Sequence, residues 1–459
     1  MTLSEKMTPL ELRASISLAS IYGLRMLGMF LILPVFAIYA SQLPGGQNHT
    51  LIGFALGAYG LTQALLQLPF GMASDHYGRK RVIYFGLMLF ALGSFVAAAS
   101  NDIYMIIIGR AIQGSGAISA AITALNADLT REEHRTKAMA MIGMTIGTTF
   151  AMSLILGPAF YHLIGISGIF NMTGVLALLA MLVVKFAVPN PQISRFHSDA
   201  EATPGKLMAV LRDRELLRLN FGIFVLHASQ MAMFVSVPFA LMETGGLDVD
   251  HHWEIYLPVM VASFLLMVPA IIYGEKQAKM KQVFLGAIAM MLLAQVGFVY
   301  SIHQFWGIVA MLVAFFVAFN VLEASLPSLI SKIAPAASKG TAMGVYNTSQ
   351  SLGLFLGGTL GGYLSHRFGS SAVFVFGSVL STLWLLLAAG MNAPPAVKTR
   401  MFHVGEMDAE KARALSQRLT VLSGVKEVVV IPEEGVAFLK VDMKQWDEQG
   451  VIELIEGAN

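Results

Sequence analysis

The chain has 459 residues, of which 56% are hydrophobic and only 13% are charged. Soluble globular proteins carry about 25% charged residues, so this composition excludes a water-soluble enzyme and indicates a membrane protein. The net charge of +2 shows no sign of nucleic-acid binding, and the absence of cysteine excludes disulfides and thiolate metal sites. We therefore expect no enzymatic activity, no cofactor and no metal site.

Long apolar runs follow one another along the chain. A bilayer core about 30 Å thick requires about 20 apolar residues per helix. We predict twelve membrane-spanning helices, at 14–40, 51–74, 82–100, 103–127, 138–163, 165–188, 219–243, 254–274, 282–301, 305–331, 340–366 and 370–391. A polar linker, 189–218, divides them into two six-helix bundles, 14–188 and 219–391. The fold class predicted for this part of the chain is therefore an all-α membrane protein.

The basic residues indicate how these helices are oriented. If the N-terminus is cytoplasmic, most of the 30 Lys and Arg residues fall in the N-terminal arm, the inside loops and the C-terminal tail, and only Arg367 falls in an outside loop. Cytoplasmic loops of membrane proteins carry an excess of Lys and Arg. The asymmetry predicts that both termini and the linker lie on the cytoplasmic side.

The two bundles show traces of an internal repeat. Pro34 matches Pro238 and Gly157 matches Gly361 at the same offset along the chain. A duplicated six-helix unit in parallel orientation explains these matches, and such proteins place the substrate between their halves. The repeat therefore predicts transport by rocking of one bundle against the other.

The loop after the second predicted helix reads Gly-Met-Ala-Ser-Asp-His-Tyr-Gly-Arg-Lys-Arg at residues 71–81. This spacing, between the second and third spans, resembles the signature loop of the major facilitator superfamily. Asp75 lies at a helix C-terminus, where the helix dipole disfavours an anion, and therefore needs a partner. Arg79 is able to bond a carboxylate at the end of the fourth helix, for which Asp128 is the candidate.

In that family the loop is thought to latch the two halves together at the cytoplasmic mouth. The resemblance therefore implies a conformational switch, and its candidate residues are Gly71, Asp75, Gly78, Arg79, Arg81 and Asp128. Anchoring at the membrane surface is the alternative role for Arg81.

Further patterns support the resemblance. Gly109-Arg110, followed by Gln113-Gly114 in the fourth helix, looks like the intramembrane arginine motif of the family. Gly28 with Pro34, and Gly157-Pro158, are similar to patterns of its twelve-helix drug/proton antiporter branch. The resemblance covers residues 14–391 and implies a secondary transporter of the bacterial inner membrane.

Four ionisable residues fall inside the predicted spans: Arg25, Arg110, His227 and Glu323. A charge at mid-bilayer costs at least about 2.5–3.5 kcal/mol, so such residues are candidates for function. His227 and Glu323 lie eight residues from the same membrane face, about 12 Å deep, and could meet.

We hypothesise that Glu323 and His227 carry a coupling proton and that Arg110 supplies a coupling or structural charge. The family resemblance implies that the first, fourth, seventh and tenth helices line a central cavity, so further cavity candidates are Arg25, Gln113 and Asn320. The alternatives are a structural histidine with satisfied hydrogen bonds, and arginines that only bond backbone carbonyls.

The sequence becomes polar after Pro394-Pro395, and residues 396–459 are predicted to form a small soluble domain. Strands are expected at 397–404, 425–431, 435–441 and 451–455, and helices at 408–422 and around Trp446. This order is typical of a ferredoxin-like α+β fold. It resembles heavy-metal-associated domains, but the thiolate ligands are missing. We predict a module for regulation, self-association or partner binding.

Together these observations favour a secondary transporter that exports hydrophobic or amphiphilic small molecules by alternating access in exchange for protons. The expected partners are protons, an unknown small molecule and the lipid bilayer, without nucleic acid. One alternative is a facilitator or proton symporter that imports a small solute. Another is a sensor that keeps the transporter fold and signals through the tail. ATP-driven pumping is disfavoured because no phosphate-binding Gly-Lys-Ser/Thr loop occurs.

Overall fold

The computed structural model describes residues 7–190, 204–277, 279–335, 338–392, 397–405, 407–432, 435–442 and 445–456. Part of the predicted linker, 191–203, and the predicted start of the tail domain at residue 396 lie outside these ranges.

The first bundle is built from seven helical segments. They are α1 (Pro9–Phe30), α2 (Leu33–Ser41), α3 (His49–Tyr77), α4 (Arg79–Ala98), α5 (Ile103–Ser115), α6 (Ser119–Leu129) and α7 (Glu132–Phe186). The predicted first span is divided between α1 and α2 just before Pro34, and the predicted fourth span is divided between α5 and α6. Within α7 the backbone is non-helical at Gly165, with φ 65° and ψ 178°, where the predicted fifth span passes into the sixth.

The second bundle follows the linker. Its elements are α8 (Pro204–Arg212), α9 (Arg214–Gly245), the short 3₁₀ helix η1 (Val249–His251), α10 (Trp253–Lys276), α11 (Met280–Ser301), α12 (Phe305–Ile333), α13 (Lys339–Phe368) and α14 (Ser370–Ala389). The linker therefore contains a helix, α8, which the sequence analysis did not predict.

Within the described residues, ten helices are long and apolar enough to cross a membrane. One of them, Lys137–Phe186 in α7, contains the predicted fifth and sixth spans. The predicted eleventh span corresponds to α13, which has 30 residues but is rich in glycine and polar side chains. Each of the twelve predicted spans thus coincides with helical structure.

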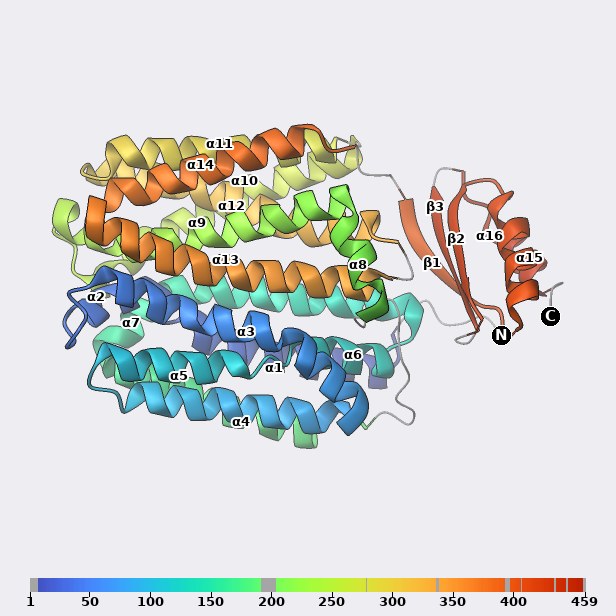
Figure 1. Cartoon of the computed structure of the whole chain (residues 1–459), viewed down its shortest axis with the longest axis horizontal. Helices are drawn as coiled ribbons and strands as arrows, with labels where there is room; N and C mark the ends of the chain where they lie inside the picture. The colour runs from blue at the N-terminus through green and yellow to red at the C-terminus, as the bar shows by residue number, and fades with distance from the viewer. Residues whose placement is uncertain are drawn as a thin grey trace.

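The two bundles meet along α3 and α13, which lie side by side at the centre of the molecule (Figure 1). A Cβ atom added to Gly53 would lie 2.0 Å from the carbonyl oxygen of Gly358, and one added to Gly60 would lie 2.5 Å from that of Ser351. Only glycine allows the two backbones to approach so closely. We call this contact the seam.

Contacts at one end also join the bundles. We call this the far end, because the tail domain lies beyond the opposite end (Figure 1). Nδ1 of His49 lies 3.3 Å from the Ser365 hydroxyl, and the His49 ring stacks on Phe239. Nδ1 of His162 lies 2.8 Å from a carboxylate oxygen of Asp250. The molecule is therefore held closed at the far end.

The tail domain has a three-stranded antiparallel sheet with strand order β1-β3-β2. Its elements are β1 (Val397–His403), α15 (Ala409–Thr420), β2 (Val425–Ile431), β3 (Val436–Asp442) and α16 (Glu448–Glu456). Both helices cover the same face of the sheet (Figure 1). The ferredoxin-like order is confirmed, but the predicted last strand at 451–455 is wrong.

Residues 451–455 form most of α16 instead. Val451 and Ile455 are four residues apart and are both buried against Leu415 and Leu419 of α15. A spacing of four places two side chains on one face of a helix and also on one face of a strand, so the sequence pattern does not distinguish the two. Packing against α15 therefore decides the conformation.

Candidate functional site

The two ionisable residues predicted to meet in the second bundle do so. Nε2 of His227 on α9 lies 3.8 Å from Oε2 of Glu323 on α12. The histidine side chain is 8% exposed and the glutamate side chain 34% exposed. Nδ1 of His227 lies 3.3 Å from the carbonyl oxygen of Ile223, and Nε2 lies 2.8 Å from the side-chain nitrogen of Gln350. The pair is therefore buried on one side and reachable on the other.

An aromatic cluster from both bundles lies beside this pair. Phe150 of α7 is 5.1 Å from Phe30 of α1 and 5.7 Å from Phe319 of α12, measured between ring centroids. Phe319 in turn packs edge-on against His227 at 5.8 Å. The cluster was not predicted, because nothing in the sequence distinguishes these phenylalanines from others in apolar helices.

Arg25 lies inside the first bundle and is fully buried. Its Nη2 donates to the Tyr59 hydroxyl at 2.7 Å and to the Gly116 carbonyl oxygen at 3.0 Å. Gly116 lies between α5 and α6, where the helical hydrogen bonding is interrupted. The Gly116 carbonyl oxygen also accepts from the backbone nitrogen of Ile118 at 2.9 Å, so Arg25 adds a second hydrogen bond at the break between the two helices.

Arg110 lies next to the same tyrosine. Its guanidinium carbon is 5.1 Å from the centre of the Tyr59 ring, and its Nη1 donates to the side-chain oxygen of Gln113 at 2.8 Å. The nitrogen of Gln113 donates to Ser94 of α4 at 2.7 Å. The polar groups predicted on the fourth helix thus bond to neighbouring helices of their own bundle.

Asn320 of α12 likewise bonds to a neighbouring helix of its own bundle, the second. Its side-chain nitrogen donates to the hydroxyl of Ser263 on α10 at 2.9 Å, and the residue is 8% exposed.

Arg79 forms the polar cluster predicted at the loop between α3 and α4. Its guanidinium pairs with Asp75, donates to the Ser74 hydroxyl at 3.0 Å and lies 3.4 Å from Asp128. The predicted contact between Arg79 and Asp128 is therefore present. Arg79 is 4% exposed and Asp128 fully buried, so the pair is held in a dry environment.

The glycines of this loop have distinct surroundings. Gly78 has φ +94°, a conformation that residues with a Cβ rarely adopt, and nothing lies within 4 Å of an added Cβ. A Cβ on Gly71 would lie 3.3 Å from Ala120 of α6. Arg81 is exposed.

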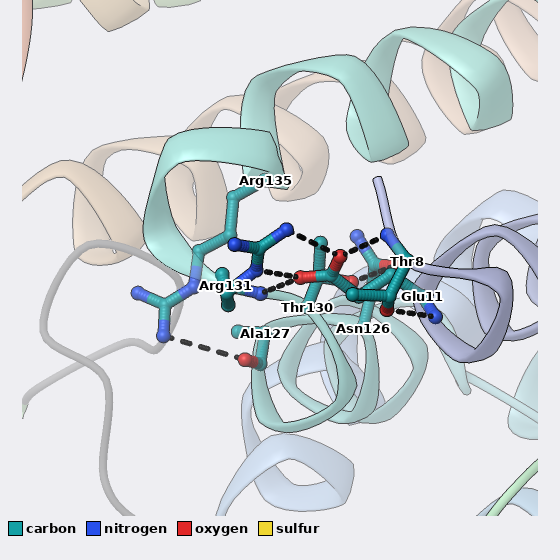
Figure 2. Close-up of polar contacts among 7 residues, drawn as sticks. All are labelled: Thr8, Glu11, Asn126, Ala127, Thr130, Arg131 and Arg135. Carbon is teal, nitrogen blue, oxygen red and sulfur yellow. Dashed lines mark hydrogen bonds and ion pairs between the residues drawn. The ribbon is translucent and has the colours of Figure 1, made fainter. Parts of the chain in front are cut away.

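A second ion pair lies at the end of the first bundle nearest the tail (Figure 2). Nε of Arg131 donates to Oε1 of Glu11 at 2.8 Å, and Nη2 donates to Oε2 at 3.1 Å. The backbone nitrogen of Thr8 also donates to Glu11, at 2.7 Å, while Arg135 donates to the Ala127 carbonyl oxygen. Thr8 and Glu11 form a capping box at the start of α1. A Thr followed three residues later by Glu, just before an apolar run, is the sequence pattern of such a box, and this pattern was not used in the sequence analysis.

An apolar groove runs between α1 and α7 in the half of the first bundle nearest the tail. It has a volume of about 370 Å³ and is lined by Ile16, Ala19, Ser20, Met141, Met144, Thr145, Thr148 and Thr149. Across the described residues, no set of three His, Asp or Glu side chains is arranged to hold a metal ion.

Residues 18–358 and 279–403 match the Major Facilitator Superfamily, and residues 407–455 match the YajR YAM domain. The chain therefore belongs to the major facilitator superfamily, a family of membrane transporters rather than enzymes, and the family predicted from the sequence motifs is confirmed.

The chain is 45% identical over 439 residues to the Inner membrane transport protein YajR of Escherichia coli (strain K12), and the match covers 96% of each chain. It is 23% identical over 395 residues to Multidrug resistance protein 1 of Bacillus subtilis (strain 168), covering 81% of this chain and 94% of that protein. A crystal structure of a bacterial homolog of the human lysosomal transporter Spinster, inward-facing and occupied, has the same fold. Its TM-score is 0.66 at 14% identity, covering 84% of this chain and 98% of that chain.

Proposed function

We propose that this chain is a proton-coupled secondary transporter that exports hydrophobic or amphiphilic small molecules by alternating access. The observation that carries the proposal is the pair formed by His227 and Glu323, whose atoms Nε2 and Oε2 are 3.8 Å apart inside the second bundle. Glu323 is the one acidic residue in the interior of the twelve predicted spans.

The surroundings of Glu323 suit a group that binds and releases a proton. Its Oε2 is buried and has no hydrogen-bond partner among the described residues, although the side chain as a whole is 34% exposed. An ionised carboxylate without partners is strongly disfavoured in an apolar environment. Glu323 therefore binds a proton when its surroundings close and releases it when they open. Arg110 supplies a fixed positive charge in the opposite bundle.

The groove in the first bundle fits an apolar cargo. The groove between α1 and α7 presents methionine, isoleucine and alanine with a few hydroxyl groups. Flexible methionine side chains adapt to apolar molecules of different shapes. The similarity to a protein named Multidrug resistance protein 1 also supports export of such molecules. Arg25, Gln113 and Asn320 then shape the bundles around the cavity.

The polar cluster around Arg79 serves as the conformational switch in this proposal. Arg79, Asp75 and Asp128 already interact within the first bundle, and Gly71, Gly78 and Arg81 form the rest of the loop. The similarity to an inner membrane protein supports a location in the bacterial inner membrane. The distribution of basic residues supports cytoplasmic termini, with 396–459 as a cytoplasmic regulatory domain.

Liposomes that contain the full chain provide the test, with ethidium as the probe. An acidic lumen and a more basic exterior should drive ethidium inward, because protons leave the lumen in exchange. A proton symporter would drive ethidium outward under the same gradient, and a facilitator would not respond to the gradient.

Glu323→Gln should reduce the gradient-driven uptake to that of liposomes without protein, and His227→Gln should weaken it. Glu254→Gln is the matched control, since Glu254 is an exposed acid in the first turn of α10. Undiminished uptake by Glu323→Gln would show that this residue does not carry the coupling proton.

A further inference from the structure

Gln350 of α13 contacts the ring of His227 in a way that fixes the position of a hydrogen atom. Nδ1 of the ring faces the Ile223 carbonyl oxygen, which only accepts hydrogen bonds, so Nδ1 carries a hydrogen. Nε2 faces the side-chain nitrogen of Gln350, which only donates, so Nε2 carries none. In this orientation of the Gln350 amide, His227 is therefore a neutral ring with its hydrogen on Nδ1.

This contact also determines where the proton of the acid–base pair resides. Oε2 of Glu323 is 3.8 Å from Nε2, which is beyond hydrogen-bond distance. Oε2 of Glu323 and the hydroxyl of Tyr346 on α13 are both buried without a hydrogen-bond partner among the described residues. Because a buried carboxylate without a hydrogen-bond partner is strongly disfavoured, the proton stays on Glu323 while Gln350 donates to His227.

Rotation of the Gln350 amide by half a turn reverses the arrangement. The amide oxygen then faces Nε2 and accepts a hydrogen bond from it, which requires a hydrogen on that nitrogen. Glu323 supplies this proton once its Oε2 moves from 3.8 Å to within hydrogen-bond distance of Nε2. The O–H bond of Glu323 breaks and its electron pair stays on the carboxylate, while the lone pair of Nε2 forms the new N–H bond. The result is an imidazolium beside a carboxylate, with an unchanged number of protons.

We propose that Gln350 is a positioning residue that decides whether the coupling proton resides on Glu323 or on His227. The proposal rests on the proton-coupled transport proposed above. The location of α13 suits this role, because the next residue, Ser351, belongs to the seam opposite Gly60. Gly353, half a turn further on, packs against the α9 backbone at Phe224. A movement at the seam is therefore transmitted to His227 through α13 alone.

Solid-state NMR of the full chain in lipid bilayers, with ¹⁵N-labelled histidine, tests this proposal. Subtracting the spectrum of His227→Gln isolates the two ring nitrogens of His227. At neutral pH the unaltered chain should show a hydrogen on Nδ1 and none on Nε2. Gln350→Leu removes the donor at similar size, and a signal from protonated Nε2 should then appear. Asn347→Leu removes a different amide from the same helix and should leave the spectrum unchanged.

Gln350→Glu provides a second variant that keeps a polar side chain at this position. Its ionised carboxylate only accepts hydrogen bonds, so it should produce an imidazolium with hydrogens on both nitrogens. A hydrogen on Nε2 in the unaltered chain, or unchanged spectra in both Gln350 variants, would overturn the proposal.

The spectra need no cargo, so they separate this proposal from the proposed function. If the Gln350 variants have altered spectra but Glu323→Gln transports normally, proton coupling through Glu323 is refuted. The control of the His227 ring by Gln350 is then still established. Unchanged spectra together with lost transport by Glu323→Gln would refute only the role of Gln350.

Discussion

The seam between α3 and α13 gives a prediction with a clear magnitude. Gly53→Ala places a Cβ atom 2.0 Å from the carbonyl oxygen of Gly358. Carbon and oxygen atoms that are not bonded normally remain more than about 3 Å apart, so the two helices must separate by about 1 Å or more at this point. The obstacle is backbone rather than a flexible side chain, and it cannot be relieved by a rotamer change.

Overpacking of this kind typically destabilises a protein by about 1–3 kcal/mol. Alanine is intrinsically more favourable than glycine in a helix, so the same replacement also stabilises the protein by about 1 kcal/mol. Gly143→Ala in α7 isolates that second effect, because nothing lies within 4 Å of its added Cβ. Because both variants share this intrinsic gain, their free energies of unfolding should differ by the overpacking cost alone, about 1–3 kcal/mol.

The assay is unfolding of the purified chain in mixed micelles with increasing SDS, followed by loss of helical circular dichroism. Gly53→Ala should unfold at a lower SDS fraction than Gly143→Ala. It should also slow ethidium transport in liposomes, because the bundles must move across the seam. Equal stability of the two variants would refute the backbone contact on which the reasoning depends.

Two further substitutions test the polar clusters near the tail. Glu11→Gln should lower the free energy of unfolding by about 1–3 kcal/mol, because the carboxylate accepts several hydrogen bonds and is 4% exposed. The SDS titration measures this effect, and an unchanged midpoint would show that Arg131 finds another partner without loss. Gly78→Ala should cost about 1–3 kcal/mol through backbone strain at φ +94°. Because an added Cβ has open space there, a neutral result in the same titration would show that the loop relaxes to a normal φ.

Much of the fold could be predicted from the sequence, because every membrane-spanning helix needs about 20 apolar residues to cross the bilayer. The length of the apolar runs predicted the helices, and the spacing in residues 71–81 predicted the family. The depth of His227 and Glu323 from the same face predicted their contact, since helix geometry converts residue numbers directly into distances.

Other features depend on tertiary contacts that no local pattern reveals. The pairing of Gln350 with His227 joins α13 to α9, and glutamine is common enough that neither its type nor its position marked it. The incorrect strand at 451–455 has a related cause. Its four apolar residues among five suit either conformation, and only packing against α15 selects the helix.

The seam has a consequence for the temperature dependence of transport. At its glycine positions, from Gly53 to Gly60 on one side and from Gly358 to Gly362 on the other, the two surfaces meet mainly through main-chain atoms, and the rings of Phe54 and Phe355 pack beside them. Sliding of one surface over the other therefore requires few side-chain rotamer changes. The activation enthalpy of the step should come mainly from lipid rearrangement and from dehydration of the closing mouth. It should respond to acyl-chain length more than to substitutions in the bundle cores.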